Sequence, residues 1–110
     1  MGFFDILKSL YGAAEKSFGG VNKPLKEALQ EAPNRQGIFT INFNHKLVYV
    51  GNGERGINRA LRNFVLSGPH SNEIRWNENL VRVSWQYCSS RELCRALAQK
   101  KIDEHQPEWN

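Results

Sequence analysis

The segment from residue 37 to residue 50 restricts the fold more than any other part of the chain. Residues 37–43, GIFTINF, have the two-residue period of a β-strand. Three large apolar side chains fall on one face of it: Phe39, Ile41 and Phe43. Asn44-His45 is expected to form a hairpin turn, because asparagine tolerates a positive φ. Residues 46–50, KLVYV, are again typical of a strand, so the segment predicts a β-hairpin.

The stretch after this hairpin predicts a helix with one apolar and one basic side. Gly51-Asn52-Gly53 ends the second strand, and residues 55–66 then carry apolar side chains at three- and four-residue steps. Arg55, Arg59 and Arg62 fall on an adjoining, largely polar side. The chain is therefore expected to run from strand to turn, strand, loop and helix.

Composition indicates one small domain with a basic surface. The chain has 110 residues, of which 40% are hydrophobic and 24% charged, and nothing in this balance indicates disorder. A net charge of +4 and a pI near 9.3 favour an anionic partner, and nucleic acid is the commonest one for a small basic domain. Charge alone is equally consistent with a basic protein that has no such partner.

The two cysteines and the hydropathy of the chain argue against several classes of protein. Cys88 and Cys94 form no CxxC pattern and have no cluster of histidines or cysteines around them, so no zinc site is expected. No run of about 18 apolar residues is present that could cross a membrane. Asp5 interrupts the place where a signal peptide would be apolar. We therefore expect a reduced, cytoplasmic or otherwise intracellular protein.

The N-terminal part predicts two helices. Residues 2–18 carry apolar side chains at helical spacing, and Gly19-Gly20 is expected to end that helix. Residues 23–31 predict a second, shorter helix. The first helix has few basic residues for a membrane-surface helix, so we expect residues 3–18 to pack on the domain, on a second copy in a homodimer, or on a protein partner. Residues 1–34 are thus interpreted as an N-terminal helical extension.

Residues 67–79 are predicted to form a loop, because glycine, proline, serine and asparagine are frequent there. This loop contains Arg75 and Trp76. An aromatic side chain beside a basic one can stack on a nucleobase. Equally, Trp76 could cover one end of the core.

A third strand and a last helix are predicted for the C-terminal part. Residues 80–87 alternate, with one strongly apolar face. Residues 89–104 predict a helix that begins with a capping box between Ser89 and Glu92. Four side chains of this helix are expected to face inward: Leu93, Ala96, Leu97 and Ile102.

Several short matches in register resemble the GIY-YIG nuclease family. They are GIF at 37–39, YVG at 49–51, Arg59 on the following helix, and the ending Pro107, Trp109 and Asn110. The resemblance covers residues 37–110, about two thirds of the chain. It implies a small α/β (α+β) domain over residues 35–110, with a three-stranded antiparallel sheet flanked by helices in the order β-β-α-β-α. The two N-terminal helices would be additions to that core.

The resemblance also implies a function, which is hydrolysis of DNA phosphodiester bonds with one divalent metal ion, Mg²⁺ or Mn²⁺. Tyr49 matches the tyrosine that orients the attacking water, and Arg59 matches the arginine that pairs with the phosphate. Asn110 would brace the hairpin. Further basic side chains are expected to contact DNA phosphates: Arg55, Arg62, Arg75, Lys100 and Lys101.

Two positions depart from the family pattern. Phe39 stands where the first tyrosine is expected, so the hydroxyl there is missing. Counting back from the Pro107–Asn110 ending, the metal-binding glutamate falls at position 98, which is Ala98 here. The other carboxylates of the last helix are not expected to replace it. Glu92 lies nearly two turns before position 98 and is expected to form the cap, and Asp103 and Glu104 lie more than a turn beyond it. We therefore expect this chain to cut DNA very slowly or not at all.

The sequence is consistent with two explanations of Ala98 and with three functional classes. The natural protein either lost its glutamate or has one that was replaced by alanine; the otherwise well-kept ending favours replacement, whereas Phe39 favours natural loss. The leading hypothesis is a DNA endonuclease disabled at Ala98. The alternatives are a noncatalytic nucleic-acid-binding module on the same fold, and a protein-interaction domain that docks through the helix at residues 3–14.

Overall fold

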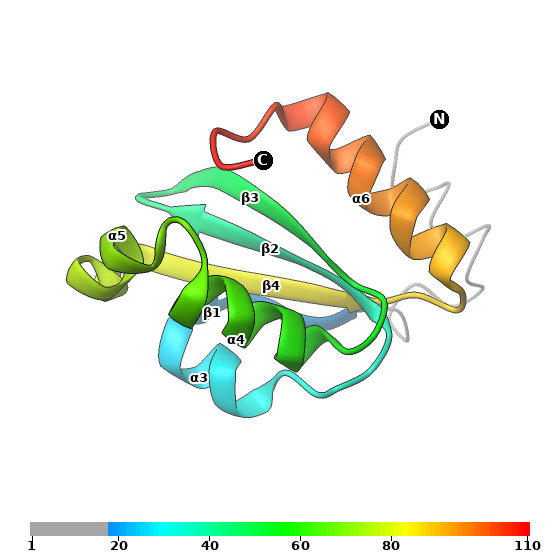
Figure 1. Cartoon of the computed structure of the whole chain (residues 1–110), viewed down its shortest axis with the longest axis horizontal. Helices are drawn as coiled ribbons and strands as arrows, with labels where there is room; N and C mark the ends of the chain where they lie inside the picture. Colours follow the sequence, from blue (N-terminus) through cyan, green and yellow to red (C-terminus); the bar gives the residue numbers. More distant parts are fainter. Residues whose placement is uncertain (1–17) are drawn as a thin grey trace.

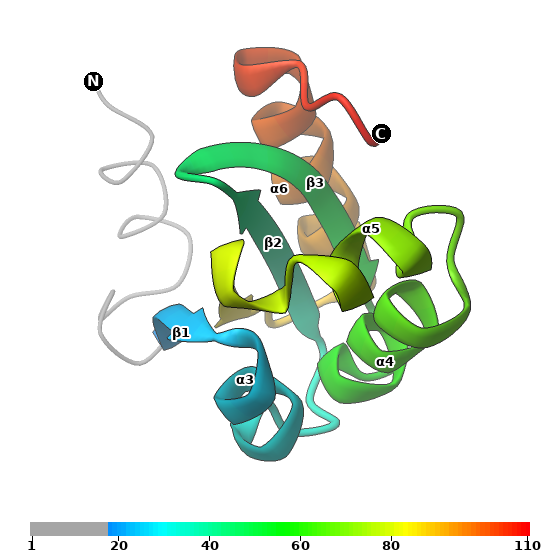
Figure 2. The ribbon, with the colours of Figure 1, turned by 90° about the vertical axis from the view of Figure 1, so that its left-hand side faces the viewer.

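The computed structural model describes residues 18–110, which form a four-stranded antiparallel sheet with helices on both faces (Figure 1). The elements are β1 (Phe18–Pro24), α3 (Leu25–Glu31), β2 (Gly37–Phe43), β3 (Lys46–Gly53), α4 (Ile57–Ser67), α5 (Ser71–Trp76), η1 (Glu78–Leu80), β4 (Val81–Tyr87) and α6 (Arg91–His105). The strands lie in the order β1-β4-β2-β3. Figure 2 shows α6 on one side of the sheet and α3 with α4 on the other. The helix predicted for residues 2–18 lies outside the described residues, apart from Phe18, which begins β1.

The α+β class is confirmed, with one strand more than predicted. Strand β1 pairs antiparallel with β4 and contains Gly19 and Gly20, which were expected to end a helix. A Cβ atom at either glycine would overlap the ring of Trp85. These glycines therefore allow the strand to lie close against a tryptophan, and the interpretation of them as a helix end is wrong. Of the two predicted N-terminal helices, the second is present as α3.

The hairpin of β2 and β3 is confirmed, including its turn. Asn44 and His45 have φ values of 51° and 67°, as a two-residue hairpin turn with positive φ at both positions requires. Strand β3 continues to Gly53, beyond the predicted end at residue 50. The pairing shifts by one residue between Ile41 and Asn42, which leaves Val48 as the extra residue of a bulge. Because of this bulge, Val48 and Tyr49 both pack on the face covered by α4.

The two faces of the sheet carry two separate apolar cores. The larger core joins the sheet to α3 and α4 through side chains that include Leu25, Phe39, Ile41, Ile57, Leu61 and Val83. The smaller core joins the other face to α6 through Ile38, Val50, Cys88, Cys94, Leu97 and Ala98. Consecutive residues of β2, Ile38 and Phe39, thus serve opposite faces, as the period of a strand dictates.

The segment predicted as a loop at residues 67–79 instead contains α5 and η1. Its one strongly buried side chain, Ile74, is 1% exposed and fixes the short helix against the sheet core. Its glycine- and serine-rich composition concealed this anchor. Trp76 is 80% exposed, so the interpretation that it covers one end of the core is wrong.

Helix α6 begins one residue later than the predicted capping box allows. The Leu93 N–H donates to Ser90 Oγ at 3.2 Å, so Ser90 is the cap, and the predicted Ser89–Glu92 box is wrong. Cys94, Leu97 and Ala98 face the sheet, whereas Ala96 is exposed, contrary to the prediction. Counting cysteine as an apolar residue would have given this helix face. No helix within residues 18–110 has the length and hydropathy needed to cross a membrane.

Candidate functional site

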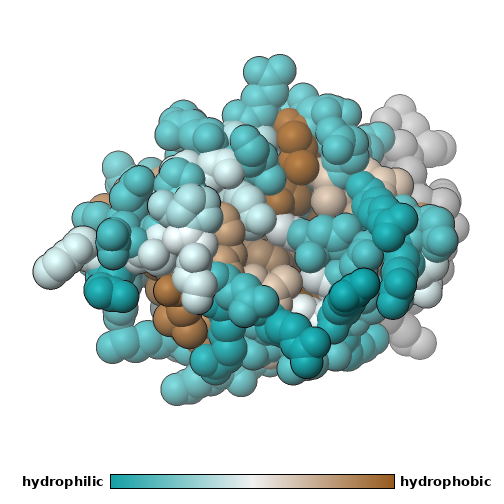
Figure 3. All heavy atoms as spheres, viewed as in Figure 1, coloured by the Kyte–Doolittle hydropathy of each residue, from teal (hydrophilic) through white to brown (hydrophobic). Residues whose placement is uncertain are grey.

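A hollow of about 560 Å³ lies at the end of β3, between the start of α4 and α6. Its polar lining comes from β3, from the loop that follows it and from both helices: Asn52, Glu54, Arg55, Arg59, Asn63 and Arg95. Figure 3 shows strongly hydrophilic side chains gathered over this part of the molecule. Gly56 forms the turn into α4 with a φ of 133°, a conformation that side chains other than glycine rarely adopt. The hollow is thus built on a fixed loop between a strand and a helix.

The start of α4 is held by the segment that precedes β2. The backbone N–H groups of the first helical turn donate to residues 33–35: Ile57 to Arg35 O, Asn58 to Pro33 O and Arg59 to Asn34 Oδ1, at 2.9–3.2 Å. These bonds satisfy amides that a helix start otherwise leaves open. The backbone of Arg59 is therefore well fixed where this residue lines the hollow.

The hollow carries more positive than negative charge. Glu54 accepts hydrogen bonds from Arg95 Nε at 3.0 Å and Arg95 Nη2 at 3.1 Å. These bonds and the charge of Arg95 hold the pKa of the Glu54 carboxyl below its ordinary value. Within residues 18–110, the side chains of Arg55 and Arg59 make no hydrogen bond or ion pair. Two guanidinium groups in the hollow therefore lack a counter-charge from this part of the chain.

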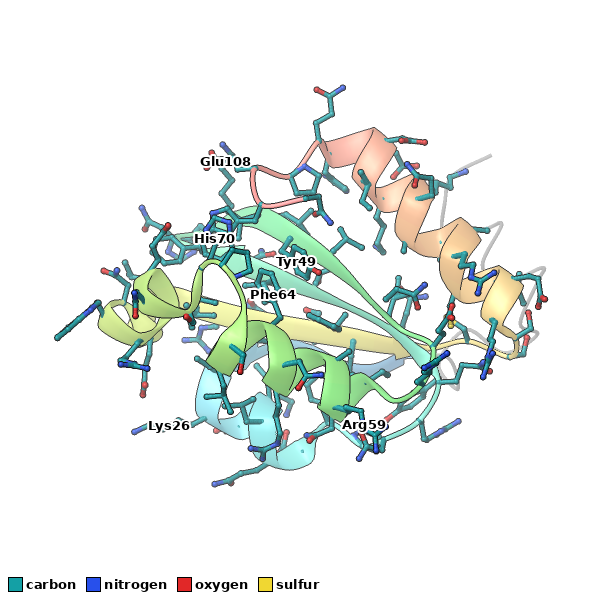
Figure 4. The ribbon with its side chains drawn as sticks, viewed as in Figure 1. Lys26, Tyr49, Arg59, Phe64, His70 and Glu108 are labelled. Carbon is teal, nitrogen blue, oxygen red and sulfur yellow. The ribbon has the colours of Figure 1, made fainter. Side chains whose placement is uncertain are left out.

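The predicted catalytic tyrosine lies outside the lining of this hollow. The Tyr49 ring stacks on Phe64, with centroids 3.7 Å apart and planes 12° apart. Figure 4 shows Tyr49 and Phe64 close to His70, whereas Arg59 lies toward the other end of α4. Burial raises the pKa of the Tyr49 phenol above its ordinary value of 10.0. This group is therefore a neutral hydrogen-bond donor at physiological pH.

Phe39 and Ala98, the two departures from the GIY-YIG pattern, are buried on opposite faces of the sheet. Phe39 is 1% exposed, and its ring lies across Gly51, where a Cβ would overlap it. Ala98 is 6% exposed and packs in the smaller core with Ile38 and Val50. Both positions are thus occupied by apolar groups in apolar surroundings.

Asn110 binds the edge strand of the hairpin. Its Oδ1 accepts the Val50 N–H at 2.8 Å and its Nδ2 donates to Val50 O at 2.9 Å. The Trp109 N–H also donates to Val48 O at 2.8 Å. The end of the chain thereby satisfies backbone groups that an edge strand would expose.

Comparison with solved structures identifies the fold. The GIY-YIG N-terminal endonuclease domain of UvrC from Thermotoga maritima, bound to its catalytic divalent cation magnesium, matches with a TM-score of 0.64 and 17% identity, over 82% of this chain and 99% of that one. This chain has the GIY-YIG endonuclease-domain fold. Two point mutants of the same domain, each bound to the cation, match with the same TM-score and 18% identity. No family model and no curated protein matches the sequence.

The GIY-YIG fold extends further along the chain than the sequence resemblance. The match covers 82% of the chain, more than residues 37–110 can supply, so it includes residues before Gly37. Residues 18–31 accordingly form β1 and α3, which belong to the same sheet and core as the rest. The predicted division into residues 1–34 and 35–110 stays a prediction.

The residues that the structure describes offer no cluster of ligands for a divalent metal ion. Ala98 offers only a methyl group, and residues 18–110 contain no group of three or more His, Cys, Asp or Glu side chains that could hold a metal. The carboxylate in the hollow, Glu54, is engaged on both oxygens by Arg95.

The other predicted phosphate contacts are dispersed. Arg62 donates to Asn58 Oδ1 and to Leu29 O, and so links α4 to α3. Arg75 is exposed on α5. Lys101 borders a different recess, and burial lowers the pKa of its amine. Lys100 precedes it on α6 and does not line the hollow. Of the predicted basic residues, Arg55 and Arg59 alone come together among those described.

Sequence reasoning missed three residues around these sites. Arg95 and Glu54 lie 41 positions apart, and neither belongs to a motif. His70 stacks on Trp109, with ring centroids 4.3 Å apart and planes 7° apart. A single histidine between a proline and a serine gave no signal for this contact.

Proposed function

We propose that this domain is a DNA endonuclease of the GIY-YIG type whose cleavage is disabled in this chain at Ala98. The observation that carries the proposal is the pair Arg55 and Arg59, which line a hollow on this fold without a carboxylate partner within residues 18–110. Guanidinium groups suit phosphate oxygens because they offer paired N–H donors in one plane. The matching UvrC domain is an endonuclease, which supports the same substrate class.

Each residue in the proposal has a separate task. Arg59 pairs with the phosphate to be cleaved, and Arg55 contacts a neighbouring one. Tyr49 orients a water molecule, and because its phenol stays protonated at neutral pH, it positions that water rather than removing its proton. Asn110 holds the strand that carries Tyr49. The divalent ion, Mg²⁺ or Mn²⁺, requires a carboxylate at position 98 that this chain lacks.

A nicking assay on supercoiled plasmid tests this proposal. We expect Ala98→Glu to nick DNA with Mg²⁺ or Mn²⁺, and the unchanged chain to leave it intact. Ala98→Gln is the matched control, because it has the same size as glutamate but cannot supply a carboxylate. Since Ala98 is 6% exposed, thermal unfolding must show that both variants fold.

Two further variants link the cleavage to this site. Added to Ala98→Glu, Tyr49→Phe or Arg59→Ala should lower the nicking rate by about a hundredfold or more. Cleavage by Ala98→Gln, or cleavage that survives Arg59→Ala, would contradict the proposal.

A noncatalytic nucleic-acid-binding module is the second candidate. This candidate is favoured by the two positions that differ from the GIY-YIG pattern, because both carry apolar side chains packed in a core. Phe39 is 1% exposed and Ala98 is 6% exposed. A folded Ala98→Glu that binds DNA with a steep salt dependence but does not cut it would support this candidate. The third hypothesis, docking through residues 3–14, concerns a segment outside the described residues.

A further inference from the structure

A third guanidinium group, from α6, completes the hollow. Arg95 lines it together with Arg55 and Arg59, so three arginines from a loop and two helices border one space of about 560 Å³. This volume is in the range of pockets that hold a whole small ligand. The hollow is therefore large enough for a phosphate together with part of the nucleotide that carries it.

Arg95 keeps hydrogen-bonding capacity while it is paired. A guanidinium group has five N–H donors, and Glu54 accepts one from Nε and one from Nη2. The other donors of Arg95 have no acceptor within residues 18–110. Glu54 thus fixes the plane of the group and leaves part of its edge available to a ligand.

The net charge of the hollow selects an anion. Three arginines and one glutamate line it, and Glu54 balances only one of the positive charges. Positive charges gathered in a concave site raise the local concentration of anions. Phosphate groups match this arrangement, because each can accept paired N–H donors from more than one arginine.

We propose that Arg95 contributes from α6 a third guanidinium group with which this hollow binds the phosphate backbone of a nucleic acid without a divalent metal ion. The ligand class rests on the proposed function, but the role of Arg95 does not depend on cleavage. Arg95 is a binding residue that no sequence motif indicates.

We expect Arg95 to be replaceable without loss of the fold. Its side chain is 64% exposed, and exposed ion pairs contribute little to stability. Arg82 is a matched control, because it is an exposed arginine on β4 opposite Asn42. Asn42 lies near the hairpin turn, whereas the hollow adjoins Gly53 at the other end of the sheet. Arg95→Gln and Arg82→Gln therefore remove the same charge from opposite ends of the molecule.

Fluorescence anisotropy with a labelled DNA duplex of about 20 base pairs tests the proposal. The dissociation constant is measured at several salt concentrations, and the slope of its logarithm against the logarithm of the salt concentration gives the salt dependence. In EDTA, we expect the unchanged chain to bind at least as tightly as in Mg²⁺. Arg95→Gln and Arg59→Gln should each weaken binding about tenfold and reduce the salt slope by about one, as expected for a lost phosphate contact. Arg82→Gln should change affinity by about twofold or less.

Three results would overturn the proposal. Equal losses for Arg95→Gln and Arg82→Gln would show a general charge effect, and a requirement for Mg²⁺ would contradict metal-free binding. Competition by inorganic phosphate as effective as competition by DNA phosphates would show a site for the free anion. Failure of Ala98→Glu to cleave, with the Arg95 effect intact, would count against the proposed nuclease alone.

Discussion

The Tyr49 phenol links the packing of one residue to its chemistry. The ring stacks on Phe64 at 3.7 Å, and the partial burial that results raises the pKa of the hydroxyl. In the unfolded chain the phenol ionises near its ordinary pKa of 10.0, whereas the folded chain holds the proton to higher pH. The folded state is therefore favoured by this proton below pH 10, and that contribution is lost as pH rises through the raised pKa.

This linkage predicts a specific alkaline effect on stability. The free energy of unfolding, measured by urea denaturation, should fall as pH rises above about 10. Tyr49→Phe should make that fall smaller, because the phenylalanine has no proton to lose. At pH 7 the variant keeps the ring stack and should lie within about 0.5 kcal/mol of the unchanged chain. An unchanged alkaline slope in Tyr49→Phe would contradict the burial of this hydroxyl.

At the scale of elements, the hairpin shows what could be predicted from sequence and what could not. The alternation of residues 37–43 and the Asn44-His45 turn are local signals, and both are confirmed. The bulge places Val48 and Tyr49 together in the core shared with α4, which lies further along the chain, and no local pattern indicated it. Strand β1 was missed for a similar reason, because its glycines are explained only by Trp85 in β4.

The contact between Phe39 and Gly51 gives a prediction for the hairpin. Phe39 and Gly51 are paired across β2 and β3, and a methyl group on Gly51 would overlap the Phe39 ring. Gly51→Ala should therefore lower the free energy of unfolding by about 1–3 kcal/mol. In the background of Phe39→Leu, the same change should cost less, because the smaller side chain leaves room.

A double-mutant cycle measured by urea denaturation tests this coupling. Arg82→Ala serves as a control, since residue 82 is exposed on β4 and pairs with neither Phe39 nor Gly51. Equal costs of Gly51→Ala with Phe39 and with Leu at position 39 would show that the two positions do not compete for space.

At the scale of the whole molecule, the sequence predicted the components of the site better than their arrangement. Arg59 and Asn110 belong to short motifs, and Asn110 makes the contact with the hairpin that was expected of it. The ion pair of Glu54 and Arg95 spans 41 positions and arises only when α6 lies beside the end of β3. The separation of Tyr49 from the hollow likewise follows from the stack on Phe64, which no spacing in the sequence indicates.

The boundary predicted between residues 34 and 35 can be tested by truncation. Residues 35–110 lack β1, α3 and the residue that follows α3, so the larger core loses Leu25, Ala28 and Ala32, which are 5%, 0% and 4% exposed. They also lack Pro33 and Asn34, which accept N–H groups of the first turn of α4. These losses should cost several kcal/mol, which is a large share of the roughly 5–15 kcal/mol that stabilise a typical domain.

We therefore expect residues 35–110 to lose cooperative unfolding at 25 °C, whereas residues 18–110 retain it. Urea denaturation followed by near-ultraviolet circular dichroism distinguishes the two, because that signal requires fixed packing of aromatic side chains such as Trp85 and Tyr49. Leu25→Ala in the full chain provides a milder version of the same loss, expected at about 2–5 kcal/mol. A fragment of residues 35–110 with the same urea midpoint as residues 18–110 would show that β1 and α3 are additions to an independent domain. The remaining strands and helices would then be sufficient to hold the larger core together.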